Sequence, residues 1–259
     1  MKILVTNDDG IESEAMWKLV EELRKRADVT VVAPDRERSA IGTAVTLFQP
    51  LHASIVRPQV EGITTWAVDG SPSDCVILGL GKLLPDGADM VVSGINPNVN
   101  LGEDVYISGT VGAASQGYFR GLPALAVSAP PGSKRGTENA ALVAARLVAT
   151  MSAGPLPRIF LNVNLPDTTL KDIAGVKITR LARASHINTV EENEHNGQKH
   201  YQLVRSRLPE TRERNTDIQA ISEGYISLTP LYTNLLDKPP WGMLKKLSAD
   251  LHTWLHQRN

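Results

Sequence analysis

The 259-residue chain contains a single cysteine, Cys75, and only 5% aromatic residues. One cysteine excludes a disulfide within the chain and a cysteine-rich zinc or iron site. It is also typical of a reducing compartment, so we expect a cytoplasmic protein. The N-terminus, MKILVTNDDG, has a short apolar stretch that meets two aspartates, and no later run approaches the roughly 18 apolar residues of a membrane span. We therefore expect neither a signal peptide nor a membrane partner.

An excess of charge of one sign is also missing. The 27 lysines and arginines are balanced by 28 aspartates and glutamates, which leaves a formal net charge of -1. Without bulk basicity we expect no nucleic-acid partner, and recognition of a phosphate has to be local. The 42% hydrophobic residues are enough to bury a core, which excludes the disordered and fibrous classes. At roughly 150 residues per domain, the length allows one large domain or one domain with a sizeable appendage.

Three common catalytic motifs are absent from the sequence. No G-x-G-x-x-G follows the first predicted strand, and no Walker lysine motif or G-x-S-x-G occurs. The absence of the glycine fingerprint argues against a nicotinamide-dependent oxidoreductase, which the alternation of strands and helices alone would suggest. P-loop and serine-hydrolase functions lose support for the same reason.

The first half of the chain repeats a β-branched apolar run, a polar turn and a stretch with helical periodicity. This βαβ pattern, with strands buried on both faces, predicts an α/β fold around a mostly parallel sheet. The pattern predicts strands at 2–5, 29–33, 55–56, 64–68, 90–92, 124–127 and 159–163, and helices at 13–26, 71–84, 109–121 and 138–150.

The second half ends in two elements that we expect to mediate self-association. Residues 177–205 read as extended pieces with a hairpin turn at Asn196-Gly197, and residues 241–257 form an amphipathic helix. An arm around residues 183–206 usually needs a partner surface. The alternative is a flexible hairpin and a helix that belongs to the core.

Adjacent carboxylates follow the first predicted strand. Asp8 and Asp9 stand where the chain turns sharply, and Gly10 is free to adopt a positive φ. In an open parallel sheet the ligand crevice lies beyond the carboxyl ends of the strands, so two like charges at that place indicate a cation. The alternative is that one aspartate caps the next helix and the other is solvated.

Neutral oxygen donors follow two further strands. Ser39 lies in the loop after the second strand, and Asn96 follows the Met90 strand. Together with Asp8 and Asp9 they suit a hard divalent ion, magnesium or manganese. Zinc is a poor fit because no histidine stands beside these loops, and we expect each histidine to be a surface residue. The histidines are His52, His186, His195, His200, His252 and His256.

A further loop enters a helix at Ser108, Gly109 and Thr110. The N-terminus of a helix exposes backbone N–H groups and favours an anion such as a phosphate. The alternative is that Ser108 or Thr110 only caps the helix while Gly109 relieves crowding.

Taken together, these motifs resemble the survival protein SurE family of metal-dependent nucleotide phosphatases. The resemblance covers most of the chain. It rests on LVTNDDGI (4–11), VVAPDRERS (31–39), DGSPSDCV (69–76), VVSGIN (91–96), NLGEDV (100–105), SGTVGAA (108–114), FLNVNLP (160–166) and TDIQAISEGYISLTPL (216–231).

The resemblance implies a Rossmann-like three-layer core whose C-terminal elements are exchanged between subunits of a homodimer or homotetramer. Residues 1–135 would form the catalytic core, and residues 136–259 would complete it and supply the arm and helix. One Mg²⁺ or Mn²⁺ per subunit would be held by Asp8, Asp9, Ser39 and Asn96. The phosphate contacts would be Asn100, Ser108, Gly109 and Thr110.

The implied reaction is hydrolysis of a nucleoside monophosphate to nucleoside and phosphate, a 5′-nucleotidase activity with 3′ activity also possible. Asp8 or Asp9 would accept a proton from the attacking water. Tyr106, Tyr118 or Trp66 would stack on the base or belong to the core. Two alternatives remain, namely a phosphatase for polyphosphate or other small phosphoesters, and a protein that binds a phosphorylated metabolite without turnover.

The chain departs from the family pattern around the site. Ala15, Ala40 and Asn98 stand where the family commonly has glycine, Ile107 stands where tyrosine is frequent, and Gln116 replaces a frequent glutamate. None of the implied ligands is changed, so we expect these departures to affect substrate preference and rate more than the class of reaction.

Overall fold

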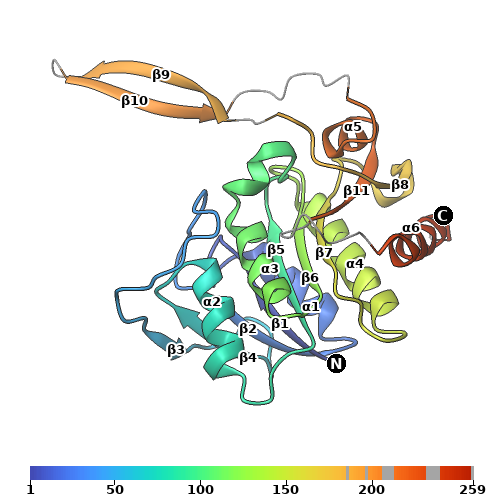
Figure 1. Ribbon diagram of the computed structural model, residues 1–259, viewed down its shortest axis with the longest axis horizontal. Coiled ribbons are helices and arrows are strands. Elements are labelled where there is room, and N and C mark those ends of the chain that lie inside the picture. The colour runs from blue at the N-terminus through green and yellow to red at the C-terminus, as the bar shows by residue number, and fades with distance from the viewer. Residues whose placement is uncertain (185–186, 196–197, 206–212, 232–239, 258–259) are drawn as a thin grey trace.

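A computed structural model describes residues 1–184, 187–195, 198–205, 213–231 and 240–257 (Figure 1). The strands are β1 (Lys2–Thr6), β2 (Asp28–Pro34), β3 (Ala53–Ile55), β4 (Thr64–Val68), β5 (Met90–Asn96), β6 (Ala124–Ser128), β7 (Phe160–Asn164), β8 (Gly175–Ile178), β9 (Ile187–His195), β10 (Gln198–Arg205) and β11 (Tyr225–Pro230). The α-helices are α1 (Glu14–Leu23), α2 (Pro72–Leu78), α3 (Gly109–Phe119), α4 (Lys134–Met151), α5 (Asp217–Ser222) and α6 (Trp241–His256). Shorter helical segments are η1 (Gly79–Leu83), η2 (Gly102–Tyr106) and η3 (Leu170–Asp172).

The main sheet confirms the predicted α/β class. Nine strands are ordered β3-β4-β2-β1-β5-β6-β7-β11-β8, and the pairs from β4 through β7 are all parallel. Because β1 and β5 lie side by side, with β2 next to β1, their carboxyl ends meet at one edge of the sheet. The predicted metal ligands lie at this edge. Asp8 follows β1, Ser39 follows β2, and Asn96 is the last residue of β5.

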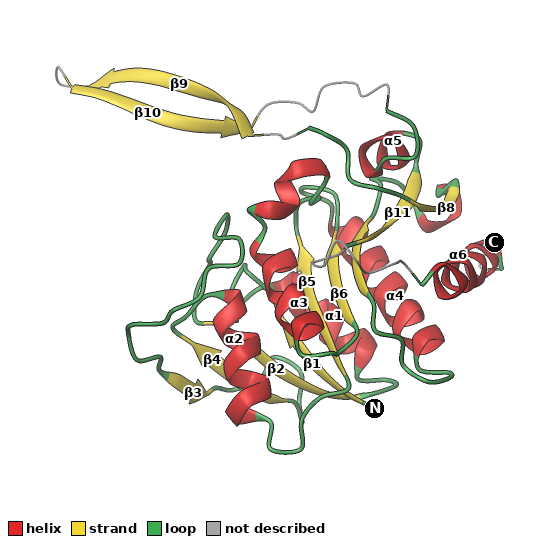
Figure 2. Cartoon of the chain, in the orientation of Figure 1, coloured by secondary structure: helices red, strands yellow, loops and turns green. Residues whose placement is uncertain are grey.

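Helices cover both faces of the sheet and form the outer layers of a three-layer sandwich (Figure 2). Helices α1 and α4 pack together over one large core, and α2 packs with α3 over a second. Helix α1 begins after the Ser13 cap and buries Met16, Leu19, Val20 and Leu23. It ends one turn before the predicted boundary, whereas α4 begins one turn earlier than predicted.

Strand β11 and helix α5 were not predicted from the periodicity. β11 runs antiparallel to β7, and Ile226 and Leu228 enter the core in the usual alternation. Its other face is polar yet buried, because the hydroxyls of Ser227 and Thr229 each lie 2.7 Å from the Thr179 hydroxyl. A buried hydroxyl cluster resembles a solvated face in the sequence, so the strand is hidden from a hydropathy pattern.

The C-terminal helix α6 belongs to the core of this chain. Leu244, Leu247, Leu251 and Leu255 are all buried, and the helix packs against α4 and β8. Asp250 fixes it further by pairing with Arg146 and accepting a hydrogen bond from Thr150. Among the described residues, no helix combines the length and the apolar composition needed to cross a bilayer.

The predicted extended arm is a separate two-stranded antiparallel sheet, β9 with β10, which projects away from the main body (Figure 1). Its predicted turn at Asn196-Gly197 lies outside the described residues. The register places Val190 opposite Leu203, and Tyr201 on the same face two residues along. These three side chains are 59%, 71% and 65% exposed. An isolated two-stranded hairpin is at best marginally stable in water, and this one exposes an apolar face.

Candidate active site

One pocket at the carboxyl edge of the sheet brings together most of the residues that the sequence singled out. Its volume is about 300 Å³. The predicted residues that line it are Asp8, Asp9, Ser39, Asn96, Asn100 and Ser108. Segments that follow β1, β2 and β5 therefore converge with the start of α3 around one space.

The turn after β1 is set by its own side chains. The Asn7 amide donates to the Gly10 carbonyl at 2.9 Å and accepts from the Gly10 N–H at 3.2 Å. Gly10 has a φ of +93°, and a Cβ there would lie 2.7 Å from the Arg36 carbonyl carbon. Only glycine fits at this position, and this tight turn fixes Asp8 and Asp9 at the rim of the sheet.

Asp8 is 4% exposed and is held from the start of helix α3. The Thr110 hydroxyl donates to its Oδ1 at 2.5 Å. Gly109 lies so close that a Cβ there would be 2.7 Å from the Asp8 Cβ. Burial raises the pKa of Asp8, while the hydrogen bonds from Thr110 act in the opposite direction. The hydroxyl of Thr110 is thus engaged with a carboxylate, and its predicted phosphate contact stays a prediction.

Asp9 carries the least compensated charge in the pocket. Among the described residues, its Oδ2 atom is buried without a hydrogen-bond partner. Burial, and after it the charges of Asp8 and Glu37, raise the pKa of Asp9 to about 7. A buried carboxylate oxygen without a donor, next to two further carboxylates, is the environment that a bound cation relieves.

Ser39 and Asn96 present oxygen rather than hydrogen to the pocket. The Ser39 hydroxyl donates to Glu37 Oε1 at 2.6 Å, so its lone pairs remain available. Asn96 is the last residue of β5. The sequence had suggested that it belongs to the loop after this strand. Its Nδ2 donates to the Asn98 carbonyl at 2.5 Å, which leaves Oδ1 as the free end of the amide.

These four residues fit a hard divalent cation. The donors comprise two carboxylates, a hydroxyl and an amide oxygen, which are the groups that Mg²⁺ and Mn²⁺ prefer. No cluster of three or more His, Cys, Asp or Glu side chains suited to a metal occurs in the part of the chain that the structure describes. The four histidines with described side chains are exposed, as expected; the side chains of His186 and His195 lie outside the described residues.

The N-terminus of α3 also borders the pocket, through its cap residue Ser108. Ser108 caps the helix, with its hydroxyl accepting from the Val111 N–H at 3.1 Å. Asn100 is fixed beside it by polar contacts with β6 and β7: its Nδ2 donates to the Ser128 hydroxyl at 3.0 Å, and its N–H donates to Asn164 at 2.8 Å. The capping alternative for Ser108 is therefore observed. The cap takes the Val111 N–H, and the Thr110 N–H is directed to the Asp8 carboxylate, so a phosphate contact at the start of α3 stays a prediction.

The comparisons with known proteins place the chain in a family. The sequence profile of the family described as survival protein SurE matches residues 3–188. The chain belongs to the survival protein SurE family. A 5′-nucleotidase SurE of Dehalococcoides mccartyi (strain CBDB1) is 48% identical over 243 residues, which cover 92% of this chain and 91% of the relative.

Further members of the SurE family show the same agreement. The 5′-nucleotidase SurE of Mannheimia succiniciproducens is 42% identical and covers 91% of this chain and 94% of its own. The crystal structure of the SurE protein from Aquifex aeolicus superimposes with a TM-score of 0.78 at 34% identity and covers 95% of this chain and 98% of that one. The likeness therefore includes the second half of the chain.

Two acidic pocket residues were missed by the sequence argument for this SurE chain. Glu37 and Asp104 both line the pocket. Glu37 lies within a loop that also carries Asp35, Arg36 and Arg38, and in the sequence it reads as one more solvated charge. Glu37 stands two residues before Ser39, and the side chains of the two residues are hydrogen-bonded. This short spacing from a predicted metal ligand is the signal in the sequence that could have identified Glu37.

The aromatic candidates for base stacking separate in the structure. Tyr118 is 4% exposed and stacks on Phe160, with ring centroids 5.8 Å apart, so it belongs to the core. Trp66 is partly buried against the second core. Tyr106 is 75% exposed at the end of η2, two residues before Ser108, and it stays the candidate for stacking.

The pKa of Asp9 leads to a prediction for stability in the metal-free protein. Because the folded pKa is about 7, against an ordinary value of 3.8, the folded state binds more protons than the unfolded state between these pH values. Stability therefore falls as pH rises through this window. We expect the Tm of the chelated protein to be lower at pH 8 than at pH 5, and Mn²⁺ to raise it more at pH 8. Differential scanning calorimetry measures both effects.

Asp9→Asn is the control for this measurement. With one titrating carboxylate removed, the decrease in Tm between pH 5 and pH 8 should become smaller, and the effect of Mn²⁺ at pH 8 should be largely lost. The contradicting result would be a metal-free Tm that rises from pH 5 to pH 8 by the same amount in the wild type and in Asp9→Asn. It would show that Asp9 does not titrate as described.

Proposed function

We propose that this protein is a divalent-metal-dependent phosphomonoesterase that hydrolyses nucleoside monophosphates to nucleoside and phosphate. The observation that carries the proposal is the pairing, in one pocket of about 300 Å³, of the Asp8 and Asp9 carboxylates with the N-terminus of α3. The carboxylates suit a cation and the helix N-terminus suits an anion, and a phosphate ester bound together with a metal ion requires both. The names of the SurE relatives as 5′-nucleotidases support the choice of substrate.

One Mg²⁺ or Mn²⁺ per subunit would be held by Asp8, Asp9, Ser39 and Asn96. When bound, such an ion offsets negative charge on the phosphoryl oxygens and lowers the pKa of water. The protein's own residues supply the remaining functions. The start of α3 would orient the phosphate through the N–H groups that neither the Ser108 cap nor Asp8 engages, and such preorganised donors are already in place when charge develops in the transition state.

We assign the general base to Asp9 rather than Asp8. The Oδ1 atom of Asp8 is engaged by the Thr110 hydroxyl, whereas Asp9 has an oxygen without a hydrogen-bond donor among the described residues. A carboxylate oxygen of Asp9 would accept a proton from the attacking water as the water oxygen bonds to phosphorus. The bond between phosphorus and the nucleoside oxygen breaks, and that oxygen takes a proton from solvent, so the products are the nucleoside alcohol and phosphate. Asp8 is fixed by Thr110 and packed against Gly109, so it holds the turn after β1 against the start of α3.

A substrate panel tests this proposal. Phosphate release from the nucleoside 5′- and 3′-monophosphates, a sugar phosphate, p-nitrophenyl phosphate and polyphosphate is measured with Mn²⁺, with Mg²⁺ and with excess chelator. We expect chelator-sensitive release, with the highest kcat/KM on a nucleoside monophosphate. A higher kcat/KM on polyphosphate or on a sugar phosphate would replace the nucleotide assignment, and phosphate binding without any release would contradict the enzymatic function.

We infer that the subunits form a homo-oligomer through the β9–β10 arm. The apolar face made by Val190, Tyr201 and Leu203 supports this inference, because all three side chains are exposed and a two-stranded hairpin is marginal on its own. A second copy of the chain is the partner that the inference commits to.

Leu203→Glu tests the role of the arm. A charge in the middle of this face should shift the protein to a smaller species in size-exclusion chromatography with light scattering, because burying an unpaired carboxylate is unfavourable. His200→Glu introduces the same charge on the opposite face, across from Asn193, and should leave the assembly unchanged. An equal effect of both variants, or none of either, would exclude this face as the contact.

A further inference from the structure

Asp217 is a buried carboxylate with no part in the chemistry proposed above. It begins helix α5 within the segment TDIQAISEGYISLTPL, and its side chain is 0% exposed. A charge buried to this degree has to be compensated by hydrogen bonds or an ion pair. The location of its partners therefore shows what the residue holds together.

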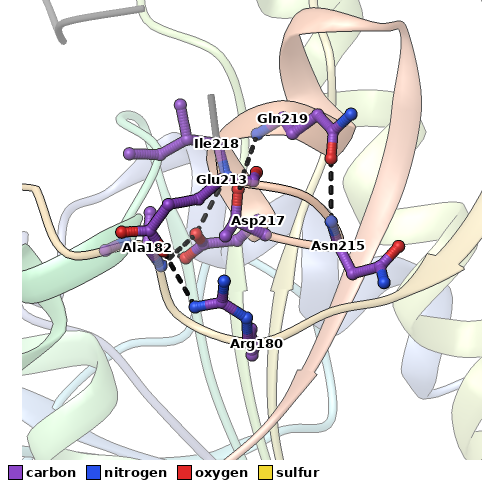
Figure 3. A network of polar contacts seen from close by, with 9 residues as sticks. Arg180, Ala182, Glu213, Asn215, Asp217, Ile218 and Gln219 are labelled. Atoms are coloured by element: carbon purple, nitrogen blue, oxygen red, sulfur yellow. Dashed lines mark hydrogen bonds and ion pairs between the residues drawn. The ribbon is translucent and has the colours of Figure 1, made fainter. Parts of the chain in front are cut away.

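The carboxylate of Asp217 joins separate segments of the chain. Its Oδ2 accepts from the Gly102 N–H at 2.7 Å, and its Oδ1 accepts from the Ala182 N–H and from the Ile218 N–H, both at 2.9 Å. Figure 3 shows Asp217 between α5 and the segment that carries Ala182. Burial raises the pKa of Asp217, and the three backbone N–H groups oppose that effect.

Segment 180–184, which leads into the arm, is fixed on both sides. On the α5 side, the Arg180 N–H donates to the Asn215 carbonyl and the Asp217 N–H donates to the Arg180 carbonyl, both at 3.0 Å. On the other side, the Glu103 N–H donates to the Ala184 carbonyl at 2.8 Å. Contact with η2 is close, because a Cβ on Gly102 would lie 2.3 Å from the Ala184 oxygen.

Gly102 lies within the segment 100–108, which lines the pocket at Asn100, Asp104, Ile107 and Ser108. It begins η2, two residues after Asn100 and six residues before Ser108, the cap of α3. The end of this segment also contacts the loop that carries Ser39, because the Gly42 N–H donates to the Ile107 carbonyl at 2.8 Å. A displacement of Gly102 would therefore move Asn100 on one side and the start of α3 on the other.

We propose that Asp217 is a positioning residue of the phosphate site: by holding the Gly102 N–H it fixes η2, and with it Asn100 and the first turn of α3, against the base of the arm. This role rests on the proposed phosphatase function. It also links the segment leading to the arm with the pocket, since Ala182 and Gly102 share one carboxylate.

Asp217→Asn separates positioning from a merely structural role. Because Oδ1 accepts two hydrogen bonds, the amide oxygen should keep that position and place its NH₂ group against the Gly102 N–H, donor against donor. We expect the Ki for inorganic phosphate and the KM for the nucleotide to rise about tenfold, because misplaced binding groups weaken substrate binding. The Mn²⁺ concentration for half-maximal activity should change little.

Glu213→Gln is the matched control. Glu213 pairs with Arg180 at 2.8 Å in the same network, whereas the Gly102 N–H is held by Asp217. It should leave KM and the phosphate Ki at wild-type values. A loss of stability alone reduces the folded fraction without changing KM or Ki. If folded Asp217→Asn therefore has wild-type KM and Ki, or if Glu213→Gln raises both equally, the positioning role is wrong.

Hydrogen exchange of the wild-type protein provides a test that does not depend on the folding of the variant. Linkage is reciprocal, so saturation with inorganic phosphate and Mn²⁺ should slow exchange in peptides covering 180–184 and 213–219 as well as in those covering 100–110. Slowing confined to 100–110 would overturn the inference. A wild-type protein that hydrolyses no phosphoester would overturn the proposed function, whereas an active wild type with an unchanged Asp217→Asn would overturn the positioning role alone.

Discussion

Asp9→Asn is expected to lower kcat for nucleoside monophosphate hydrolysis by roughly 10²- to 10⁴-fold, the range by which a positioned general base accelerates a reaction. The amide has nearly the shape of the carboxylate but neither its charge nor its basicity. The same substitution removes a poorly compensated buried charge, because the Oδ2 atom of Asp9 has no hydrogen-bond partner among the described residues. The metal-free variant should therefore unfold at a higher temperature than the metal-free wild type at pH 8.

This combination of lower activity and higher stability is diagnostic, because a variant that simply misfolds loses both. Steady-state kinetics with saturating Mn²⁺, together with calorimetry of the chelated protein, measure the two quantities. Glu12→Gln is the control, since Glu12 is exposed on the same loop and contacts Gln59 rather than the pocket. Asp9→Asn with more than a tenth of wild-type kcat would remove Asp9 from the chemistry.

Gly109→Ala is expected to reduce kcat/KM by roughly 10- to 100-fold, because small displacements of a reacting group have effects of this size. The added methyl group would lie 2.7 Å from the Asp8 Cβ and 3.0 Å from its Oδ2. Asp8 is held by Thr110 on the same helix, so it cannot move away without breaking that hydrogen bond. Overpacking should also destabilise the protein by about 1–3 kcal/mol.

The Mn²⁺ dependence of activity distinguishes this displacement from general damage. If the methyl group pushes Asp8 aside, the Mn²⁺ concentration for half-maximal activity should rise together with the loss of kcat/KM. Gly154→Ala is the control, because a Cβ at Gly154 meets no atom within 4 Å. Unchanged activity of Gly109→Ala would show that α3 and Asp8 are not packed as tightly as this structure requires.

Much of the site could be predicted from the sequence because its residues follow strands that are easy to recognise. Asp8 follows β1 and Asn96 ends β5, and both strands are rich in apolar, β-branched residues. In a parallel sheet the ends of neighbouring strands meet at one edge. The proximity of these two residues could therefore be predicted from the sequence alone. It could not assign different roles to the aspartates, because the difference arises from Thr110, which is 102 residues from Asp8 in the chain.

The second half was harder to predict because its buried polar groups resemble solvated ones. One face of β11 carries Ser227 and Thr229, whose hydroxyls cluster with that of Thr179, so the strand lacks an apolar pattern on that face. Asp217 resembles an ordinary acidic residue at the start of a helix. Its partners Gly102 and Ala182 donate from the backbone, and no side-chain pattern reports a backbone donor. Such long-range polar contacts become visible only when the fold is known.

A divalent ion at Asp8 and Asp9 and an anion at the start of α3 are expected to share one pocket. Crystals grown with excess Mn²⁺ and a phosphate analogue, with diffraction data collected at the manganese absorption edge, test this arrangement most directly. One anomalous peak per chain should appear in contact with Asp8, Asp9, Ser39 and Asn96, with the anion between that peak and the first turn of α3. Manganese bound elsewhere, with these four side chains pointing apart and no anion at α3, would contradict it.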